Sequence, residues 1–423
     1  GVDSNRVVWV TSARNGLDRI DSDTGKIERW DERLGLEGKA LTAVLQDNRA
    51  HLWVGTQLGL HRYALDTLSA VEMPVDLTRA DALPPGYVDN LVLASDGSIW
   101  AGVHGGGAVH IGDEPPRVLK RYIPADRTLG DSDISVLALD ASGSPWLATA
   151  SGVERLDAKR DRFVDVAGVP HESVHALAFA PDGSLWLHRL GALEHYRVSA
   201  AGVHLEQRLD AAHGWPTLTA RSLAVSADGT VWVTSSRGLW RVDGHSHAIR
   251  RFNASDGLPS QEFVAGALTQ APDGVLFAGT LQGAVAFDPA TLQLHSSPSP
   301  LRITALTMRR RGRVVPLDPA VPVELGYDDL DLSVEARVLS YANPSSNRYQ
   351  FRLVNFESGW VDANRGERVY SQLPPGDYRL RARGANADGV WTELAQPLHV
   401  SVARAPWATP FAYALYAIAM VLA

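Results

Sequence analysis

The pentapeptide His171-Glu172-Ser173-Val174-His175 fits the H-E-x-x-H pattern, in which two histidines bind zinc and the glutamate is the general base of a peptidase. That chemistry requires a helix, because only there do residues i and i+4 lie on one face. The residues that follow instead alternate apolar and small side chains up to Asp182-Gly183, and then continue as Leu-Trp-Leu. Because Asp-Gly tolerates the positive φ angles of a two-residue turn, this pattern predicts a β-hairpin.

In a strand, His171 and His175 lie about 13 Å apart, given a rise of about 3.3 Å per residue, so they cannot bind one zinc ion together. The glycine-rich stretch 103–110 also lacks the Lys-Ser/Thr pair and the helix of a phosphate-binding loop, and fits a hairpin turn. We therefore interpret both motifs as parts of strands and turns, and predict no metal, no cofactor and no catalytic residue in this chain.

The chain has 423 residues, a formal net charge of −8, 12 tryptophans and no cysteine. Its length favours two domains or one repeat architecture over a single compact core. The negative charge argues against a nucleic-acid partner, because binding to phosphates requires a basic surface. The absence of cysteine excludes disulfides, cysteine-bound metals and thiol catalysis, and leaves the cellular compartment open.

A hairpin with an aromatic residue on its second strand recurs along residues 1–297. The aromatic residues are spaced by 40 to 47 residues, and they are Trp9, Trp53, Trp100, Trp146, Trp186, Trp232 and Phe277. Four short antiparallel strands per about 40–45 residues are typical of a β-propeller blade, whose aromatic side chain packs against the neighbouring blade. We therefore predict a seven-bladed propeller. Its first blade is incomplete at the N-terminus, and we expect the missing inner strand upstream or from another segment.

Residues 250–289 carry the motifs Asp256-Gly257-Leu258-Pro259-Ser260, Asp273-Gly274 and Phe287-Asp288-Pro289 in that order. This arrangement resembles the last blade of the two-component regulator propeller. Other blades depart from that consensus, for example with Trp215 in place of the usual Leu. Seven repeats in register make the resemblance specific, although a single repeat does not.

Pro298 and Pro300 mark a linker, and residues 298–404 contain strand patterns typical of an immunoglobulin- or fibronectin-like β-sandwich. The stretch 373–378, Leu-Pro-Pro-Gly-Asp-Tyr, resembles a tyrosine corner. Together with Tyr349, Trp360, Tyr370 and Trp391, it resembles the Y-Y-Y domain that follows regulator propellers. Phe351 stands where that family often has a tyrosine.

Residues 405–423 become wholly apolar from Phe411 onward, and their last 13 residues would rise about 20 Å as a helix, short of a bilayer core of about 30 Å. Trp407, Tyr413 and Tyr416 suit a membrane interface. We expect the start of a truncated transmembrane helix, with a buried soluble helix as the alternative. The run Arg309–Arg313 fits a hairpin tip with Gly312 in the turn, although it would also suit an anionic lipid or an acidic partner.

The resemblance implies the extracytoplasmic sensing half of an inner-membrane receptor, whose cytoplasmic half is a histidine kinase or a diguanylate cyclase. It also implies a small-molecule or glycan ligand on the propeller and a homodimer through the Y-Y-Y sandwich. The alternatives are a propeller enzyme, such as a lyase or hydrolase acting at the channel mouth, and a scaffold or adhesion module.

Propellers usually bind ligands at the mouth of the central channel, on the face that carries the turns between second and third strands. Alignment of the repeats predicts eight ligand-binding residues there: Arg14, Gln57, His104, Arg189, Trp215, Arg237, Glu262 and Gln282. Such side chains around a wet mouth would suit a glycan or a carboxylate. For each one taken singly, a solvated loop residue remains the alternative.

Overall fold

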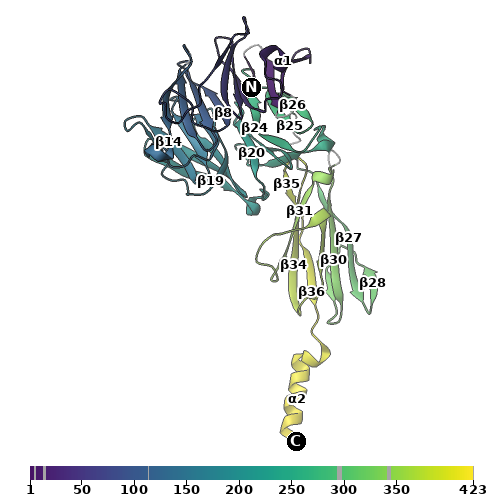
Figure 1. Cartoon of the computed structure of the whole chain (residues 1–423). Helices are drawn as coiled ribbons and strands as arrows, with labels where there is room; N and C mark the ends of the chain where they lie inside the picture. The colour runs from purple at the N-terminus through teal and green to yellow at the C-terminus, as the bar shows by residue number, and fades with distance from the viewer. Residues whose placement is uncertain (4–5, 13–15, 113, 293–297, 341–343, 423) are drawn as a thin grey trace. The chain divides into compact units, whose positions relative to one another are not determined.

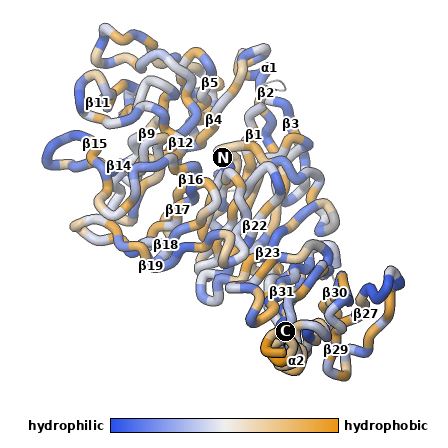
Figure 2. Tube along the Cα trace, turned by 90° about the horizontal axis from the view of Figure 1, so that it is seen from below, coloured by the Kyte–Doolittle hydropathy of each residue, from blue (hydrophilic) through white to orange (hydrophobic). Residues whose placement is uncertain are grey.

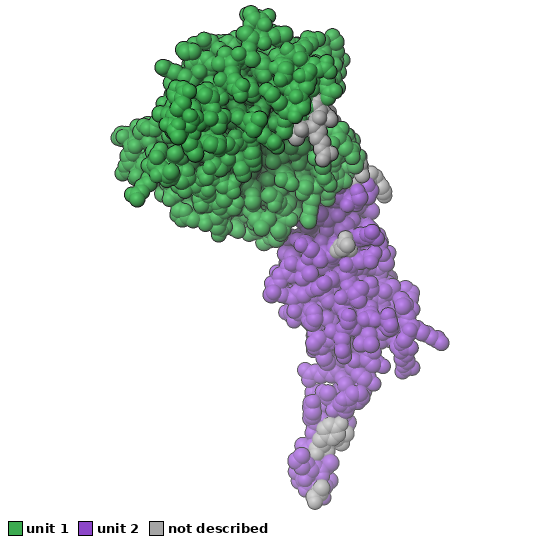
Figure 3. Space-filling model, viewed as in Figure 1, with its two compact units in different colours: residues 1–293 green, residues 294–423 purple. Residues whose placement is uncertain are grey.

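The computed structural model describes all residues except 4–5, 13–15, 113, 293–297, 341–343 and 423. The chain divides into two compact units, residues 1–293 and 294–423, which are shown in Figures 1 and 3. The boundary expected after residue 297 falls at residues outside the described ones. Each unit is considered by itself below.

Unit 1 is a β-propeller: its described residues form seven antiparallel sheets, each a meander of consecutive strands. Blade 1 contains β1 Val7–Ser12, β2 Gly16–Asp21 and β3 Ile27–Arg29, followed by the short helix α1 Asp31–Leu34. Blades 2 to 4 contain β4 Leu41–Gln46, β5 His51–Thr56, β6 Gly59–Ala64, β7 Ala70–Glu72, β8 Val88–Leu93, β9 Ile99–Val103, β10 Gly107–Gly112, β11 Arg117–Tyr122, β12 Ile134–Leu139, β13 Pro145–Thr149, β14 Gly152–Asp157 and β15 Arg162–Asp165.

Blades 5 to 7 contain β16 Val174–Phe179, β17 Leu185–Arg189, β18 Ala192–Ser199, β19 Gly202–Leu209, β20 Ala220–Val225, β21 Val231–Ser235, β22 Gly238–Val242, β23 Ile249–Phe252, β24 Phe263–Gln270, β25 Leu276–Thr280 and β26 Gly283–Phe287. Short 3-10 turns occur at Pro124–Asp126, Ala211–His213, Ala254–Asp256, Pro289–Thr291, Pro344–Ser346, Asn364–Gly366 and Pro406–Ala408. The predicted all-β propeller is confirmed.

The repeated aromatic residue of each blade packs against the next blade. Trp53 lies with Ile99 of blade 3, and Trp146 lies with Leu185 of blade 5. Phe277 of blade 7 packs against Val8 of blade 1, which closes the ring. Because one sheet alone would leave these rings in water, each blade depends on its neighbours for burial.

Blade 1 has three named strands, whereas blades 2 to 6 have four. On the inner side of β1, residues 1–3 pair through a bridge between Val2 and Val8 and through backbone bonds from Trp9 N–H to Gly1 O, at 2.8 Å, and from Asp3 N–H to Val7 O, at 3.0 Å. An ion pair between Arg6 and Asp273, at 3.1 Å, joins blade 1 to the hairpin turn of blade 7. The ring therefore closes through apolar packing and a charge pair at the same junction.

In blades 2, 4 and 6 the indole nitrogen of the repeated tryptophan donates to the hairpin of its own blade, whereas Trp9 Nε1 donates to Gln46 of blade 2 at 2.7 Å. Trp146 Nε1 donates to the Asp140 carboxylate at 2.9 Å, and the backbone N–H groups of Ser142 and Ser144 donate to the same carboxylate at 2.9 and 3.0 Å. Asp47 holds Trp53 in the same way, at 3.0 Å. One acidic side chain thus fixes both the turn and the ring that the next blade needs.

Unit 2 is a two-layer β-sandwich. One sheet has the order β28-β27-β30-β33, and the other has the order β29-β36-β34-β31-β32, with β35 paired to β34. The strands are β27 Leu301–Arg310, β28 Arg313–Pro316, β29 Val323–Leu325, β30 Leu330–Val338, β31 Arg348–Val354, β32 Val361–Asp362, β33 Glu367–Tyr370, β34 Gly376–Ala385, β35 Trp391–Glu393 and β36 Leu398–Val402. Alternate apolar residues of both sheets form one core, as expected for a sandwich.

The predicted tyrosine corner is present, because the Tyr378 hydroxyl donates to the Pro374 carbonyl at 2.8 Å. Arg310–Arg313 form the turn between β27 and β28, as expected for a hairpin tip. After β36 the chain forms the helix α2 Pro410–Leu422, which is strongly hydrophobic in Figure 2. Within the described residues, we find no helix with the length and apolar character needed to span a bilayer.

We predict that Asp140→Ala destabilises the propeller by about 2–3 kcal/mol, because it removes an acceptor from a buried indole N–H and from two turn amides. Asp140→Ser is the matched variant, since Ser226 accepts from Trp232 Nε1 at 2.9 Å in blade 6. Urea unfolding followed by circular dichroism should place the serine variant nearer to the wild type. Equal stability of all three proteins would contradict the role assigned to Asp140.

Candidate ligand-binding site

One face of the propeller, here called the mouth face, carries two kinds of loop. In a four-stranded meander, the turn between the second and third strands lies at the same edge as the loop that leads into the next inner strand. Gln57, His104, Arg237 and Gln282 lie exposed in turns between second and third strands. Glu262 is exposed in the loop before β24, and Arg14 lies outside the described residues. Whether the exposed residues bind a ligand stays a prediction.

Two of the predicted residues do not face solvent. Arg189 is 5% exposed and Trp215 is 1% exposed, so the prediction that they lie on the rim is wrong. Arg189 is the last paired residue of β17, opposite Ala192, whereas Leu190 and Gly191 form the turn. A shift of one residue along a strand moves a side chain to the other face, and for this reason Arg189 points inward.

Arg189 lies at the position that carries a hydroxyl in five other blades, Ser12 of blade 1 included. The hydrogen bond across the turn is described for four of them. There the hydroxyl donates to a glycine carbonyl across the turn, as Thr280 does to Gly283 at 2.7 Å. The residues are Thr56, Thr149, Ser235 and Thr280. In blade 5, a long cationic side chain therefore replaces the small hydroxyl residue that stabilises the turn in those blades. A buried cation needs anionic partners.

Arg189 obtains those partners from its own blade. Its guanidinium donates to the fully buried Glu194 carboxylate, with Nε to Oε2 at 3.0 Å, and also pairs with Glu172 in the loop before β16. The Tyr196 hydroxyl and Arg208 donate to the same Glu194 carboxylate at 2.8 and 3.0 Å. This network ties a mouth loop to the third and fourth strands of blade 5, and its role is structural.

Trp215 belongs to the core between blades 5 and 6. Its indole Nε1 donates to Nε2 of His188, at 3.4 Å, and both side chains are buried. Burial, followed by the charge of His175, lowers the pKa of His188 to about 3. His188 is therefore a neutral acceptor at physiological pH.

The pentapeptide 171–175 spans a loop and the start of β16. His171 and Glu172 are exposed in the loop, whereas His175 lies in the strand with its ring centroid 6.2 Å from that of His188. Within the described part of the chain, we find no group of three or more side chains that could hold a metal. The expectation of a strand in place of a zinc-binding helix is confirmed.

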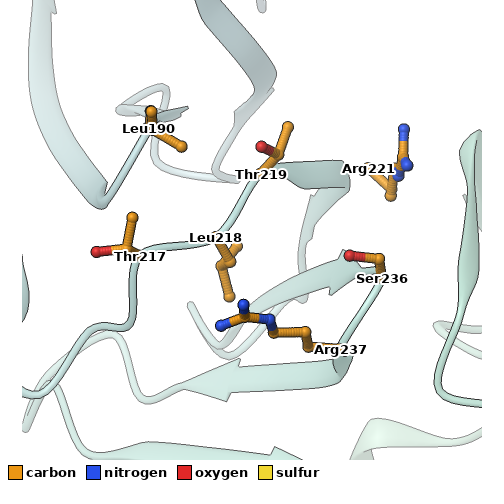
Figure 4. Close-up of a pocket in the computed structure, with 7 residues that line it drawn as sticks. All are labelled: Leu190, Thr217, Leu218, Thr219, Arg221, Ser236 and Arg237. Carbon is orange, nitrogen blue, oxygen red and sulfur yellow. The ribbon is translucent and has the colours of Figure 1, made fainter.

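A depression of about 390 Å³ lies on the mouth face between blades 5 and 6 (Figure 4). It is lined by Leu190, Thr217, Leu218, Thr219, Arg221, Ser236 and Arg237. Arg221 is the extra residue of a bulge in β20, between Ala220 and Ser222. Bulges redirect a side chain out of the regular alternation, and this one gives the depression a second arginine.

The charge of this depression is positive and uncompensated. No carboxylate pairs with Arg221 or Arg237 among the residues that the structure describes. A third guanidinium lies close by, because Arg251 Nε donates to the Arg237 carbonyl at 2.8 Å. Burial, and secondarily the charge of Arg237, lower the pKa of Arg251. Such a group of cations favours an anion in the depression.

Blades 3 and 4 give the mouth face an acidic side. Tyr87 and His104 stack with ring centroids 4.5 Å apart and an interplanar angle of 12°. Burial, and then the charges of Asp89 and Asp133, raise the pKa of Tyr87. Asp89 is the bulged residue of β8, as Arg221 is of β20. The mouth face thus carries cations on blades 5 and 6 and carboxylates on blades 3 and 4.

The sequence analysis missed Arg221 and Asp89 as mouth residues. Both are second residues of an inner strand, where the register shifts, and β4, β12 and β16 have the same bulge. The recurrence of a polar residue at this position, namely Thr42, Asp89, Ser135, His175 and Arg221, was the available signal.

Residues 340–403 match the Y_Y_Y domain family, which confirms the predicted resemblance of the sandwich. Over 457 residues the chain is 22% identical to Histidine kinase P4 of Formosa agariphila, covering 98% of this chain and 32% of that protein. The chain therefore spans less than a third of the length of this curated relative.

Two solved structures share the fold. The extracellular domain of the hybrid two component system BT4673 from B. thetaiotaomicron is 18% identical, with a TM-score of 0.54, over 96% of this chain and 56% of that one. A catalytically inactive virginiamycin B lyase from Staphylococcus aureus, determined with quinupristin, is 14% identical, with a TM-score of 0.53, over 68% of this chain and 92% of that one.

We predict that acid weakens the propeller through His188. A histidine whose folded pKa of about 3 lies below its ordinary value of 6.5 contributes its full stability above pH 6.5 and loses it as the pH falls toward 3. Between pH 7.5 and pH 5 the loss is about 2 kcal/mol. His188→Gln retains an acceptor for Trp215 and does not titrate, so its unfolding free energy should fall by about 2 kcal/mol less over this range. Identical pH profiles would contradict the burial of a neutral His188.

Proposed function

We propose that the chain is the ligand-sensing, extracytoplasmic part of a membrane-bound two-component receptor. Three features in sequence order support this function: a propeller with an open charged mouth, a sandwich that matches the Y_Y_Y domain, and an apolar helix. The similarities to a histidine kinase and to the extracellular domain of a two component system agree with that order. The output half would be a histidine kinase or a diguanylate cyclase, on the inner side of the membrane.

The depression between blades 5 and 6 is the observation that carries the ligand assignment. Arg221 and Arg237 flank it, and Thr217, Thr219 and Ser236 add hydroxyl groups. Guanidinium groups bind carboxylates in a bidentate manner, and hydroxyls hydrogen-bond to sugar hydroxyls. A carboxylate-bearing sugar fits this chemistry, and the exposed side chains on other blades, Gln57, His104, Glu262 and Gln282, stay predicted rim contacts.

A propeller enzyme is the second candidate, since one structural neighbour is a lyase. That similarity covers 68% of this chain at 14% identity, and it supports the fold alone. A lyase activity would also give no role to the sandwich or to α2. The sensor function accounts for all three parts, and we prefer it for that reason.

Signal transfer in this proposal requires two copies. A ligand shifts an equilibrium between two poses only by its different affinity for them, and a dimer of sandwiches provides two such poses. The outer face of the four-stranded sheet suits this contact, because Val314 and Val369 are exposed around a depression of about 300 Å³, which Thr307, Ser333 and the ion pair Arg309–Asp331 also line. The helices α2 would carry the relative movement into the membrane.

We predict that Arg221→Gln/Arg237→Gln weakens binding of digalacturonate at least tenfold, because the carboxylate loses two charge-assisted hydrogen-bond donors. Isothermal titration calorimetry on the whole chain measures this, with digalactose as the neutral counterpart. Arg117→Gln/Arg162→Gln is the matched control, since both arginines are exposed and lie beside turns between third and fourth strands, at the opposite face.

In that experiment, equal affinity of the wild type for the acidic and the neutral disaccharide would contradict the anion site. Binding unchanged in the double variant would do the same. Failure of every acidic sugar to bind would remove the ligand assignment altogether.

We predict a concentration-dependent dimer in sedimentation velocity, which Val369→Asp should dissociate by replacing one of the two exposed valines of the contact with a charge that must be desolvated. Val321→Asp is the control, because Val321 is 53% exposed in the loop between β28 and β29. A wild-type chain that stays monomeric at high concentration, even with ligand, would count against the dimer.

A further inference from the structure

Five segments of the sandwich lie at one end of it, here called the base. The register of β27 with β30 pairs Arg309 with Leu330, so the turn 310–313 lies beside the loop 326–329. The loop 371–375 leads from β33 to Gly376, which pairs with Val402 at the end of β36. Val354 pairs with Arg379 near the same end, which places residues 355–357 there too. The segment 403–409, which leads into α2, also begins at the base.

The base exposes aromatic side chains that a soluble domain would normally bury. Tyr327, Phe356 and Trp407 are 42%, 49% and 58% exposed. Tyr327 packs edge-on against Trp407 with ring centroids 5.1 Å apart, which fixes the segment before α2 on the sandwich. The backbone bond from Ala403 N–H to the Leu325 carbonyl, at 2.9 Å, supports the same attachment. Exposed aromatic rings of this kind favour the headgroup level of a bilayer.

The base also carries cations without a carboxylate partner. Arg309 pairs with Asp331 at 3.0 Å, and Arg310 pairs with Asp329 at 2.6 Å. Within the described residues, no such pair is formed by the exposed Arg311, Arg313 or Arg404. The exposed carboxylates at this end are Glu324, Asp328 and Asp377. In Figure 2 the turn after β27 is strongly hydrophilic (blue).

We propose that the base of the sandwich rests on a bilayer, with Arg311, Arg313 and Arg404 on anionic headgroups and the three aromatic rings at the interface. Continuity with α2 selects a lipid surface over a soluble acidic partner: its large side chains Phe411, Tyr413, Ile418, Met420, Val421 and Leu422 are between 57% and 85% exposed. Contact of the base with lipid would hold the sandwich in a defined orientation to the membrane. A movement of the sandwich would then be transmitted to α2. This inference extends the membrane attachment proposed above, but it rests on separate residues.

The experiment is co-sedimentation of the whole chain with vesicles of neutral phosphatidylcholine, and with vesicles that also contain phosphatidylglycerol. The wild type should bind both, and bind the anionic vesicles more tightly. Arg311→Gln/Arg313→Gln should lose roughly ten- to thirtyfold in affinity for anionic vesicles, because each arginine near a charged surface contributes about 1 kcal/mol. Its binding to neutral vesicles should not change. Arg117→Gln/Arg162→Gln on the propeller is the control, because it also replaces two exposed arginines by glutamine and so changes the net charge by the same amount.

The aromatic part is tested with Tyr327→Ser/Phe356→Ser, which should weaken binding to both vesicle types, since interfacial partition of a ring does not need lipid charge. Circular dichroism checks that each variant is folded. Absence of vesicle binding by the wild type would overturn both the membrane attachment and this inference. Binding that is equal on both vesicle types and unchanged in the arginine variant would overturn the lipid contact of the base, while leaving attachment through α2 intact. Capture of an acidic protein in place of anionic vesicles would overturn it as well.

Discussion

The propeller depends on one contact repeated around a ring, the aromatic side chain of a second strand packed against the next blade. Trp53 and Trp232 are fully buried by it, and Phe277 against Val8 completes the circle. The aromatic side chain packs against the next blade only when its orientation is fixed. The carboxylates of Asp47 and Asp140 provide this, because each accepts the indole N–H together with turn amides. Burial of the ring and closure of the hairpin are therefore one cooperative event.

This explains why the sequence alone predicted so much of the fold. A tryptophan every 40 to 47 residues after a tight turn is compatible with few folds other than propeller blades. The Tyr-corner motif at 373–378 is likewise compatible with few folds other than a sandwich. The mouth was predicted less well, for two physical reasons. The repeat alignment placed Arg189 one residue away from its true register. In a strand, a shift of one residue moves the side chain to the opposite face of the sheet. Arg221 points outward because of a bulge, which alternation of apolar residues does not reveal.

Blade 5 shows how a departure from the repeat is accommodated. Where five other blades have a glycine, alanine or threonine followed by a hydroxyl residue, blade 5 has His188 and Arg189, both buried. The histidine remains neutral and accepts from Trp215, and the arginine is matched by Glu194 and Glu172. Arg189 thus replaces a hydroxyl-to-backbone bond across the turn with a link to the loop before β16, and His188 adds a link to Trp215 in the loop before β20. The mouth loops before β16 and β20 are thereby fixed from below, which gives the depression between blades 5 and 6 a rigid wall.

Arginine serves three purposes in this chain, and the difference lies in what surrounds it. In the interior, Arg189 is compensated by carboxylates, as any buried charge must be. At the mouth and at the base, Arg221, Arg237, Arg311 and Arg313 have no such compensation within the described residues, although the chain carries 48 acidic residues against 40 basic ones. Exposed arginines without a carboxylate partner also occur singly, as at Arg117 and Arg162, but at the mouth and the base they are grouped, and the grouping is what favours an anion from outside. We propose a soluble anion for the mouth and a charged lipid surface for the base, which is itself one end of the sandwich.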